Sequence, residues 1–390
     1  MQITRASLLL LYSAYYFGAR FQYSGYISIC AILLIVAIEF YQRPNISNLL
    51  IIYVLLSSYY ALNMYIINNS VDIGTGMAII SIPIIFDALT KNQLITKNIV
   101  LTLSAPSILI FTIFIFYILI EIFPTPGYSF ARIPLSTLAQ IFTLNSNSSI
   151  RDWASTDAIA GILISFPFML LLVKSNKRIQ FLLMLASVLV SLYIFKMVAL
   201  IATLVFAIVF QIDTKYHKYL VSIVISLLII YPFIVISDYF VQLITDSYVN
   251  YLLSYRGEIW ASAINMINHD SSRFLFGIGQ REIQIREIFS HDHYYMDISY
   301  HSGLLRLLVQ NGYVFFLLSF MSIFHLIRKY YRLCSAFTKK IVLSTLLAWL
   351  SFNISDGSLF YSFSFIISIF IPISLLIGHD EKYKHQQIKE

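Results

Sequence analysis

A histidine and a carboxylate near the start of an apolar run have the residue types and spacing for proton transfer. His301 stands just before the apolar stretch that begins at residue 303, and a helix N-terminus there would disfavour imidazolium and keep the ring neutral. A neutral imidazole can take the proton of an attacking hydroxyl near neutral pH. Asp297, four residues earlier, would orient this ring if the turn between them is helical. The alternative is an interfacial histidine that hydrogen-bonds only to backbone at a helix end.

Basic side chains differ in type between the two sides of the predicted membrane topology. With both termini in the cytoplasm, 17 of the 26 basic residues lie on the cytoplasmic side, mostly as lysine, whereas eight of the nine outer ones are arginine. A planar, forked guanidinium suits two-point contacts with phosphate or carboxylate. We therefore expect the outer cations to bind an anion; the alternative is a chance bias in a small set. The candidates for this contact are Arg256, Lys196, Arg151, Arg132 and Arg306.

Arg306 differs from the other candidates because it lies five residues after His301, inside a predicted helix. An ionisable side chain at that depth is costly if it faces lipid. We therefore expect Arg306 either to face a polar cavity or to extend its charged end toward the membrane surface.

Histidines and cysteines provide little support for a metal site or a disulfide. Four of the eight histidines lie in the polar segment that ends at residue 302, two of them in "HDHYYMD". A His-x-His pair with nearby acids is weak evidence for a metal, so we expect no metal or other cofactor. The two cysteines fall in a predicted span and a predicted inner loop, which excludes a structural disulfide on the outer side. Nucleic acid is not an expected partner, since the inner lysines form no dense patch.

The composition predicts that these residues are positioned by a bundle of membrane-spanning helices. Hydrophobic residues make up 59% of the 390 residues and charged residues only 12%, which is about half the charged share of an average soluble protein. Apolar runs of about 20 residues, the length that crosses a bilayer as a helix, recur along the chain between short polar breaks. We predict one all-α integral membrane domain over 1–390 with both termini cytoplasmic. Its twelve spans are expected at 6–19, 23–41, 49–67, 77–90, 98–122, 158–173, 180–195, 197–211, 219–240, 303–325, 341–355 and 358–377.

Two long polar segments are predicted on the outer side, over 123–157 and 241–302. Long segments of mixed composition are usually functional, so the second is expected to carry the active site. Within it, Trp260, Ile264 and Ile267 have the spacing of an amphipathic helix. That helix could lie on the membrane surface or pack against the protein itself, and the spacing does not separate the two.

The second polar segment also resembles a motif of the O-antigen polymerase and O-antigen ligase superfamily. In "RGEIWASAINMINHDSSRFLFGIGQ", the residues of the family pattern are Arg256, Trp260, Gly277 and Gly279. The pattern is an arginine, a tryptophan after it and then a Gly-x-Gly. The layout of ten or more spans, with a long outer loop that ends in histidine, is similar to that of the family as well.

A second stretch, "HSGLLRLLVQNG", resembles the histidine motif of the same superfamily. His301 is followed by leucines after four and seven residues and by Gly312 after eleven. Lys196 occupies the place where the family often has an arginine after a short helical hairpin.

The resemblance implies a glycosyltransferase that uses glycans linked to undecaprenyl diphosphate at the outer face of the bacterial inner membrane, without a metal. His301 would be the base and Arg256 the first contact to the diphosphate, supported by the other outer cations. A polymerase of this superfamily passes the growing glycan to the non-reducing sugar of a lipid-linked repeat unit. A ligase passes the glycan to lipid A core. A chain-length regulator and a flippase are expected partners.

Polymerase is the function that we predict, and two alternatives stay open. Ligase activity uses the same chemistry, so the sequence separates it poorly from polymerase activity. A flippase or other transporter of lipid-linked oligosaccharide would also be apolar and basic. A transporter, however, concentrates ionisable residues within helices near the middle of the membrane, and here they concentrate in the outer segments.

Overall fold

The computed structural model describes residues 48–68, 73–91, 104, 166–193, 197–252, 256–268, 270–279, 302–355 and 370–380. All the regular structure in these ranges is helical, and they contain no strand, which confirms the all-α class. The longer helices are α3 (Asn48–Asn68), α4 (Ile73–Lys91), α8 (Lys177–Tyr193), α9 (Met197–Gln211), α10 (His217–Val235), α15 (Gly303–Tyr331) and α16 (Ala336–Ser355). The shorter ones are η2 (Thr214–Tyr216), α11 (Asp238–Thr245), α12 (Ser247–Leu252), α13 (Arg256–Asn268), α14 (Ser271–Phe276) and α18 (Ile371–Gly378).

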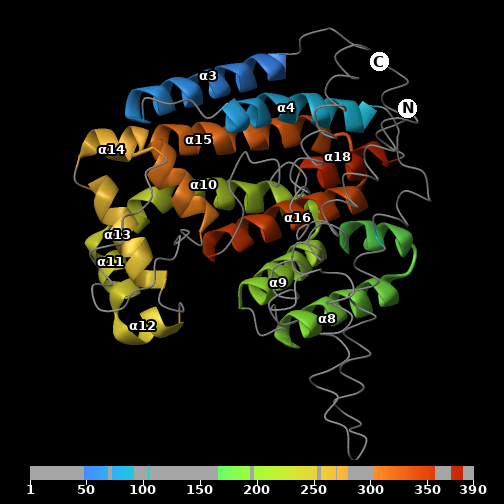
Figure 1. The fold of residues 1–390 in the computed structure, drawn as a ribbon. Coiled ribbons are helices and arrows are strands. Elements are labelled where there is room, and N and C mark those ends of the chain that lie inside the picture. The colour runs from blue at the N-terminus through green and yellow to red at the C-terminus, as the bar shows by residue number, and fades with distance from the viewer. Residues whose placement is uncertain are drawn as a thin grey trace, which may run out of the picture.

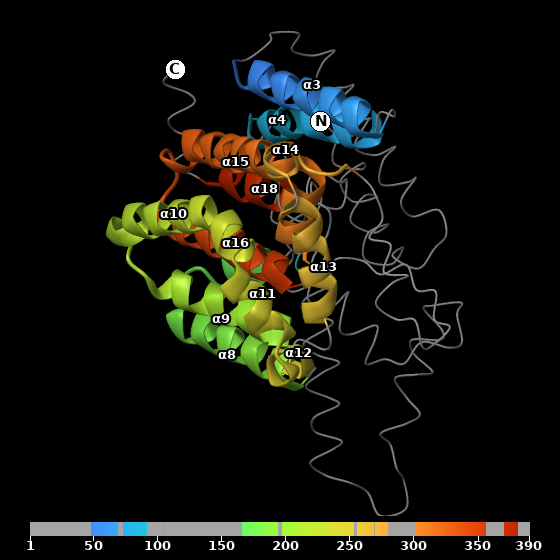
Figure 2. The same ribbon diagram turned by 90° about the vertical axis from the view of Figure 1, so that its left-hand side faces the viewer.

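The long helices lie in layers (Figure 1). From top to bottom, α3 and α4 lie on α15 and α18, α10 and α16 follow, and α8 and α9 form the lower edge. The view turned by 90° shows the same order, with α13 running across the layers (Figure 2). The short helices α11 to α14 therefore gather at one end of the bundle.

Three of the helices are long and apolar enough to cross a membrane, over Leu50–Asn68, Thr214–Val235 and Gly303–Tyr331. They differ in how much the protein covers them. In the most apolar part of each, 67% of the residues of α15 are buried but only 17% of those of α10. α15 is therefore the central helix of the bundle, whereas most of α10 is exposed.

The predicted spans correspond to observed helices wherever the structure describes them, but several ends differ. The helix predicted over 219–240 ends at Val235, because Ser237 caps a new helix, α11, by accepting a hydrogen bond from the backbone N–H of Phe240. The helix predicted over 303–325 continues to Tyr331. The predicted spans 6–19, 23–41 and almost all of 98–122 lie outside the described residues, as do parts of 158–173 and 358–377.

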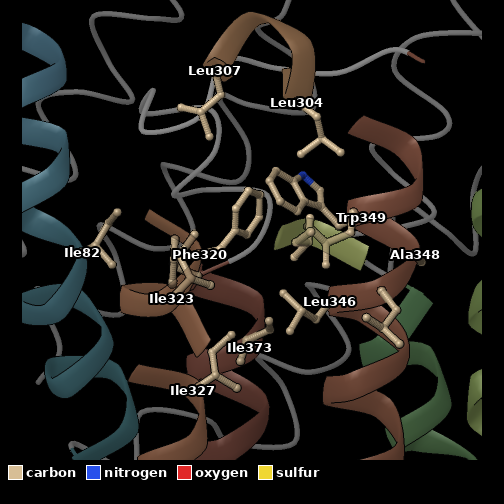
Figure 3. Close-up of a cluster of buried hydrophobic side chains, with 14 of the residues drawn as sticks. Ile82, Leu304, Leu307, Phe320, Ile323, Ile327, Leu346, Ala348, Trp349 and Ile373 are labelled. Atoms are coloured by element: carbon tan, nitrogen blue, oxygen red, sulfur yellow. The ribbon is translucent and has the colours of Figure 1, made fainter. Parts of the chain in front are cut away.

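One cluster of the hydrophobic core lies between α4, α15, α16 and α18 (Figure 3). Leu346 and Trp349 of α16 face Phe320 and Ile323 of α15, and Ile373 of α18 packs beside them. Close packing of such side chains stabilises a membrane bundle through van der Waals contacts rather than through removal from water. The core thus holds α15, the helix that carries one half of the candidate site, in a fixed position.

The amphipathic helix predicted from Trp260, Ile264 and Ile267 is α13. These three side chains are 7%, 0% and 1% exposed, respectively, and α13 contacts α11, α12, α14 and α15. The prediction of the helix is therefore confirmed, and its apolar face packs against the protein rather than lying on the membrane.

Candidate functional site

The helix α15 is broken at Gly312, which corrects the prediction of one uninterrupted span. Gly312 has φ 77° and ψ 174°, a conformation that essentially only glycine adopts. Figure 1 shows the consequence as two orange ribbons that meet at an angle below α14. The break divides α15 into a short first half, which begins at Gly303, and a long second half, which ends at Tyr331.

The backbone around Gly277 and Gly279 pairs with the end of the first half of α15. The N–H of Ile278 donates to the carbonyl of Val309 at 2.9 Å, and the N–H of Gly279 donates to the carbonyl of Gln310 at 3.0 Å. Carbonyls at the end of a helix have no partner within the helix, so this segment satisfies two of them. The Gly-x-Gly stretch therefore stabilises the break.

Close backbone contact explains why glycine occupies both sides of this junction. A Cβ on Gly277 would lie 2.4 Å from the carbonyl oxygen of Gln310, and one on Gly312 would lie 2.3 Å from that of Leu275. Gly277 also has a positive φ, 82°. The junction consequently joins the two stretches that resemble the superfamily, although these two glycines are 35 positions apart in the sequence.

Neighbouring helices hold the junction in place. The side-chain amide of Asn63, on α3, donates to the carbonyl of Phe276 at 2.7 Å. Three aromatic rings from three helices pack together next to the break: Phe233 of α10 lies 5.7 Å from Phe274 of α14 and 5.1 Å from Tyr313 of α15, measured between ring centroids. Phe274 and Tyr313 also stack, at 5.4 Å. These contacts fix the short helix α14 against the bundle.

Arg256 is the first residue of α13 and is half-buried. The N-terminus of this helix is tightly held, because the N–H of Gly257 donates to the side chain of Asn250 at 3.1 Å, and that side chain donates to Glu258 at 3.1 Å. A Cβ on Gly257 would lie 1.9 Å from the carbonyl oxygen of Ile244. A cation at the positive end of a helix is unfavourable for stability but favourable for binding an anion.

Arg306 lies in the first half of α15 and is also half-buried. Its Nε donates to the side-chain oxygen of Gln310 at 3.2 Å, one turn further along the helix. α13 and α15 are in contact, so the structure places Arg256 and Arg306 on neighbouring elements. Gln310 orients the guanidinium of Arg306, and its own backbone carbonyl belongs to the junction.

Ser302 caps α15 and is almost fully buried. Its hydroxyl oxygen accepts from the N–H of Leu305 at 3.2 Å and donates to the carbonyl of Asn353 at 3.4 Å. The prediction that a helix begins directly after His301 in the sequence is thereby confirmed.

The other predicted site residues lie outside the described residues: His301, Asp297, Lys196, Arg151 and Arg132. For Lys196 the flanking helices are described, and α8 and α9, which contact each other, leave only three residues between them. Lys196 therefore lies between the two helices of this hairpin, directly before α9, and not after the hairpin as expected.

One polar side chain that positions the site, Asn63, was not predicted from the sequence. It is buried, at 7% exposed, and lies within an apolar helix, α3. A lone asparagine in a predicted span is a signal that could have identified it, because a buried amide needs a partner. The contact of Ser302 with residue 353 gives no such signal, because it uses a backbone carbonyl, which every residue has.

The electrostatics of this end of the bundle include one perturbed acid. Asp270 caps α14, and hydrogen bonds from the hydroxyl and then the N–H of Ser272 hold the pKa of its carboxyl below the usual range. In the part of the chain that the structure describes, no three His, Cys, Asp or Glu side chains gather as a metal-binding group.

Comparison with protein-family models, with curated proteins and with solved structures finds no match to this chain.

Proposed function

We propose that the protein is a surface-polysaccharide polymerase of the O-antigen type, a membrane glycosyltransferase that uses glycans carried on undecaprenyl diphosphate. The observation that carries the proposal is the junction at Gly312. It joins the arginine, tryptophan and Gly-x-Gly stretch to the histidine stretch, and these are the two stretches whose pattern resembles the superfamily. Segments that act on one substrate must be neighbours, and these two are.

The proposed reaction needs a base and a cationic site for the leaving group. The acceptor hydroxyl oxygen attacks the anomeric carbon of the donor sugar, and the hydroxyl proton goes to the neutral imidazole of His301. The bond between that carbon and the diphosphate oxygen breaks. Arg256 takes up the charge of the diphosphate at the N-terminus of α13, assisted by Arg306. Asp297 orients the imidazole, and Lys196, Arg151 and Arg132 are the further cations of the site.

The topology is part of the same proposal. Twelve spans with both termini in the cytoplasm place residues 123–157 and 241–302 on the outer face of the inner membrane, where lipid-linked repeat units are polymerised. The helices α11 to α14, together with the beginning of α15, would then form the outer end of the bundle. The lipid bilayer supplies the undecaprenyl tail.

The test is complementation of a deletion strain, with the cell-surface glycan as the readout. We expect wild-type protein to restore long chains, and Arg256→Ala and His301→Ala to leave lipid A core capped with single repeat units. Arg273→Ala is the matched control, because Arg273 is an exposed arginine of α14 on the same end of the bundle. Normal chain lengths in both site variants would disprove the proposal. Loss of all capping would indicate a ligase if lipid-linked units reach the outer face, and a transporter if they stay on the cytoplasmic face.

A transporter of lipid-linked oligosaccharide is the second candidate, and the broken helix α15 favours it. Discontinuous spans often line the binding sites of secondary transporters. Only this one of the three membrane-length helices described has such a break. The same deletion strain separates the two functions. Loss of a flippase leaves the lipid-linked units on the cytoplasmic face and lipid A core without any repeat unit. Loss of a polymerase leaves lipid A core capped with single repeat units.

A further inference from the structure

Three connecting segments meet at the end of the bundle opposite to α11 to α14. They are 174–178, 213–218 and 328–340. Lys174 Nζ lies 5.8 Å from the ring centroid of Phe337, and Lys339 Nζ lies 5.7 Å from that of Tyr331. The hydroxyl of Tyr331 is hydrogen-bonded to the imidazole of His217, which joins the middle segment to the last one.

This end of the bundle, which we call the basic end, carries a strong excess of positive charge. Among the described residues its acids are Asp87, Asp213 and Asp380. Asp87 accepts a hydrogen bond from Tyr330, and Asp380 is buried and accepts from Ser335 and Thr338. The basic side chains there are Lys174, Lys177, Arg178, Lys215, Lys218, Arg328, Lys329, Arg332, Lys339 and Lys340.

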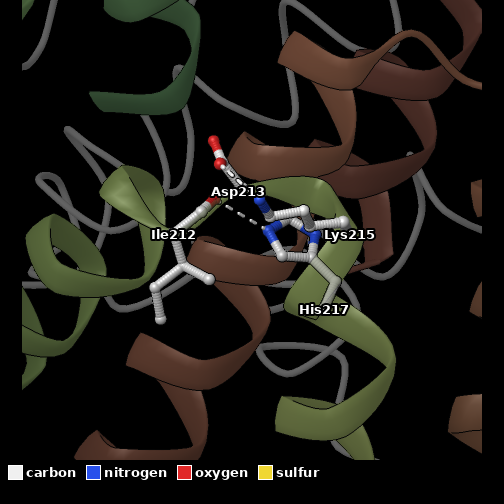
Figure 4. A network of polar contacts seen from close by, with 4 residues as sticks. All are labelled: Ile212, Asp213, Lys215 and His217. Atoms are coloured by element: carbon white, nitrogen blue, oxygen red, sulfur yellow. Dashed lines mark hydrogen bonds and ion pairs between the residues drawn. The ribbon is translucent and has the colours of Figure 1, made fainter.

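The one exposed acid of the basic end neutralises little of this charge. Asp213 lies 3.8 Å from Lys215, close to the imidazole of His217 (Figure 4). The two side chains of the ion pair are 65% and 66% exposed, and an exposed pair of this kind is weak. An external anion can therefore compete for the lysine.

An apolar strip on α10 begins beside these lysines. Tyr219, Ile223 and Leu227 recur every four residues and are 57%, 56% and 56% exposed, so they form one uncovered face of the helix. Lys218 Nζ lies 4.7 Å from the ring centroid of Tyr219. The lysines and the apolar strip therefore form one continuous surface. Such a surface favours a lipid, which has both a charged headgroup and apolar chains, over a soluble anion.

We propose that the basic end binds one anionic phospholipid of the bilayer. Its phosphate contacts Lys215 and Lys218, and its acyl chains lie along Tyr219, Ile223 and Leu227. The lysines supply the attraction to a negative headgroup, and the tyrosine ring sits at the level between headgroup and acyl chains that aromatic side chains favour. The site is independent of the glycosyltransferase proposal, since it uses none of the same residues.

The experiment is native mass spectrometry of the full-length protein in detergent, titrated with phosphatidylglycerol or phosphatidylcholine. We expect wild-type protein to retain phosphatidylglycerol in preference. The double variant Lys215→Gln/Lys218→Gln should bind it roughly 30-fold more weakly, from about fivefold for each lysine near a lipid surface. Arg273→Gln, an exposed arginine at the opposite end of the bundle, should bind like wild type.

Two further arms decide the nature of the site. Lys215→Arg/Lys218→Arg keeps the charge and should retain the lipid, which separates lost charge from misfolding. Ile223→Ala/Leu227→Ala should weaken lipid retention although both lysines are kept. Millimolar inorganic phosphate should not displace the lipid from this variant or from wild type. Equal retention of both lipids by wild type, or displacement of the lipid by millimolar inorganic phosphate, would overturn the proposal.

Discussion

At the scale of single residues, three glycines determine how the two motif stretches meet. Gly277 and Gly312 approach the backbone of each other's segment so closely that any side chain would overlap a carbonyl group. Gly279 lies against the side chain of Asn68. A Gly-x-Gly stretch thus has a steric role here, since it allows one chain segment to lie directly on the open end of a helix.

We expect Gly312→Ala to destabilise the protein by about 1–3 kcal/mol from its backbone conformation alone, because φ 77° with ψ 174° is strained for any side chain. The overlap with the carbonyl of Leu275 adds to this cost. Thermal unfolding of the purified protein in detergent measures it as a lower Tm. Gly76→Ala is the control, because its Cβ would meet only the hydroxyl of Ser57, at 3.2 Å. An unchanged Tm for Gly312→Ala would contradict the broken helix.

At the scale of elements, short helices are fixed by caps and by contacts with long helices. α14 has only six residues, too few to be stable alone. It is held by Asp270 at its beginning, by Asn63 of α3 at its end and by the aromatic contacts of Phe274. α11 begins in the same way, with Ser237 as its cap. The end of the bundle that carries the candidate site is therefore built from elements that depend on their neighbours.

The cap on α14 predicts a dependence on pH. The pKa of Asp270 is lower in the folded protein than in the unfolded chain. The cap therefore stabilises α14 fully at a pH above the pKa in the unfolded chain, which is about 4. This stabilisation is lost as the pH falls through the pKa in the folded protein. Amide exchange of residues 272–276, corrected for the intrinsic rate, should accelerate below about pH 4. Asp270→Asn keeps a capping oxygen that does not titrate, and this variant should lack the acceleration. Identical profiles for both proteins would argue against the cap.

At the scale of the whole molecule, the bundle separates two ends of different character. One end carries α11 to α14, the break in α15 and three arginines, Arg256, Arg273 and Arg306, and the other carries the lysine-rich connections. The C-terminal part of the described chain closes the basic end. The carboxylate of Asp380 accepts from the backbone N–H of Ser335 at 3.2 Å and from the hydroxyls of Ser335 and Thr338, both at 2.5 Å. Ser335, which caps α16 by accepting from the N–H of Thr338, is thus held by a residue 45 positions away.

We expect Asp380→Ala to lower the free energy of unfolding by about 2–3 kcal/mol, because buried donors lose a charged acceptor. Asp380→Asn should have a smaller effect, since an amide oxygen can still accept. Denaturant or thermal unfolding in detergent provides the measurement. Asp213→Ala is the matched control, because an exposed ion pair contributes about 0–1 kcal/mol. Equal stability of Asp380→Ala and Asp213→Ala would show that the hydrogen bonds to Asp380 contribute little to stability.

The sequence by itself determined the helical class, the approximate position of each described long helix and the apolar face of α13, but not what that face packs against. Apolar runs of about 20 residues and a spacing of three to four residues are local properties, so they can be read without the fold. The beginning of α15 was predicted for the same reason. Of the candidate site, Arg256 and Arg306 are found on neighbouring elements, whereas the proposed base remains a prediction from its motif.

Only the tertiary structure decided where helices break and which residues form hydrogen bonds with the backbone groups at their ends. The run after residue 303 is mostly apolar, and the pair Asn311 and Gly312 is the one local sign of a turn in it. The break exists because Ile278 and Gly279 donate hydrogen bonds to the carbonyls that it exposes. The backbone N–H of Ser335, directly before α16, depends in the same way on a distant partner, Asp380. A buried polar backbone group needs a partner, and when that partner is distant in the sequence, only the fold shows which residue it is.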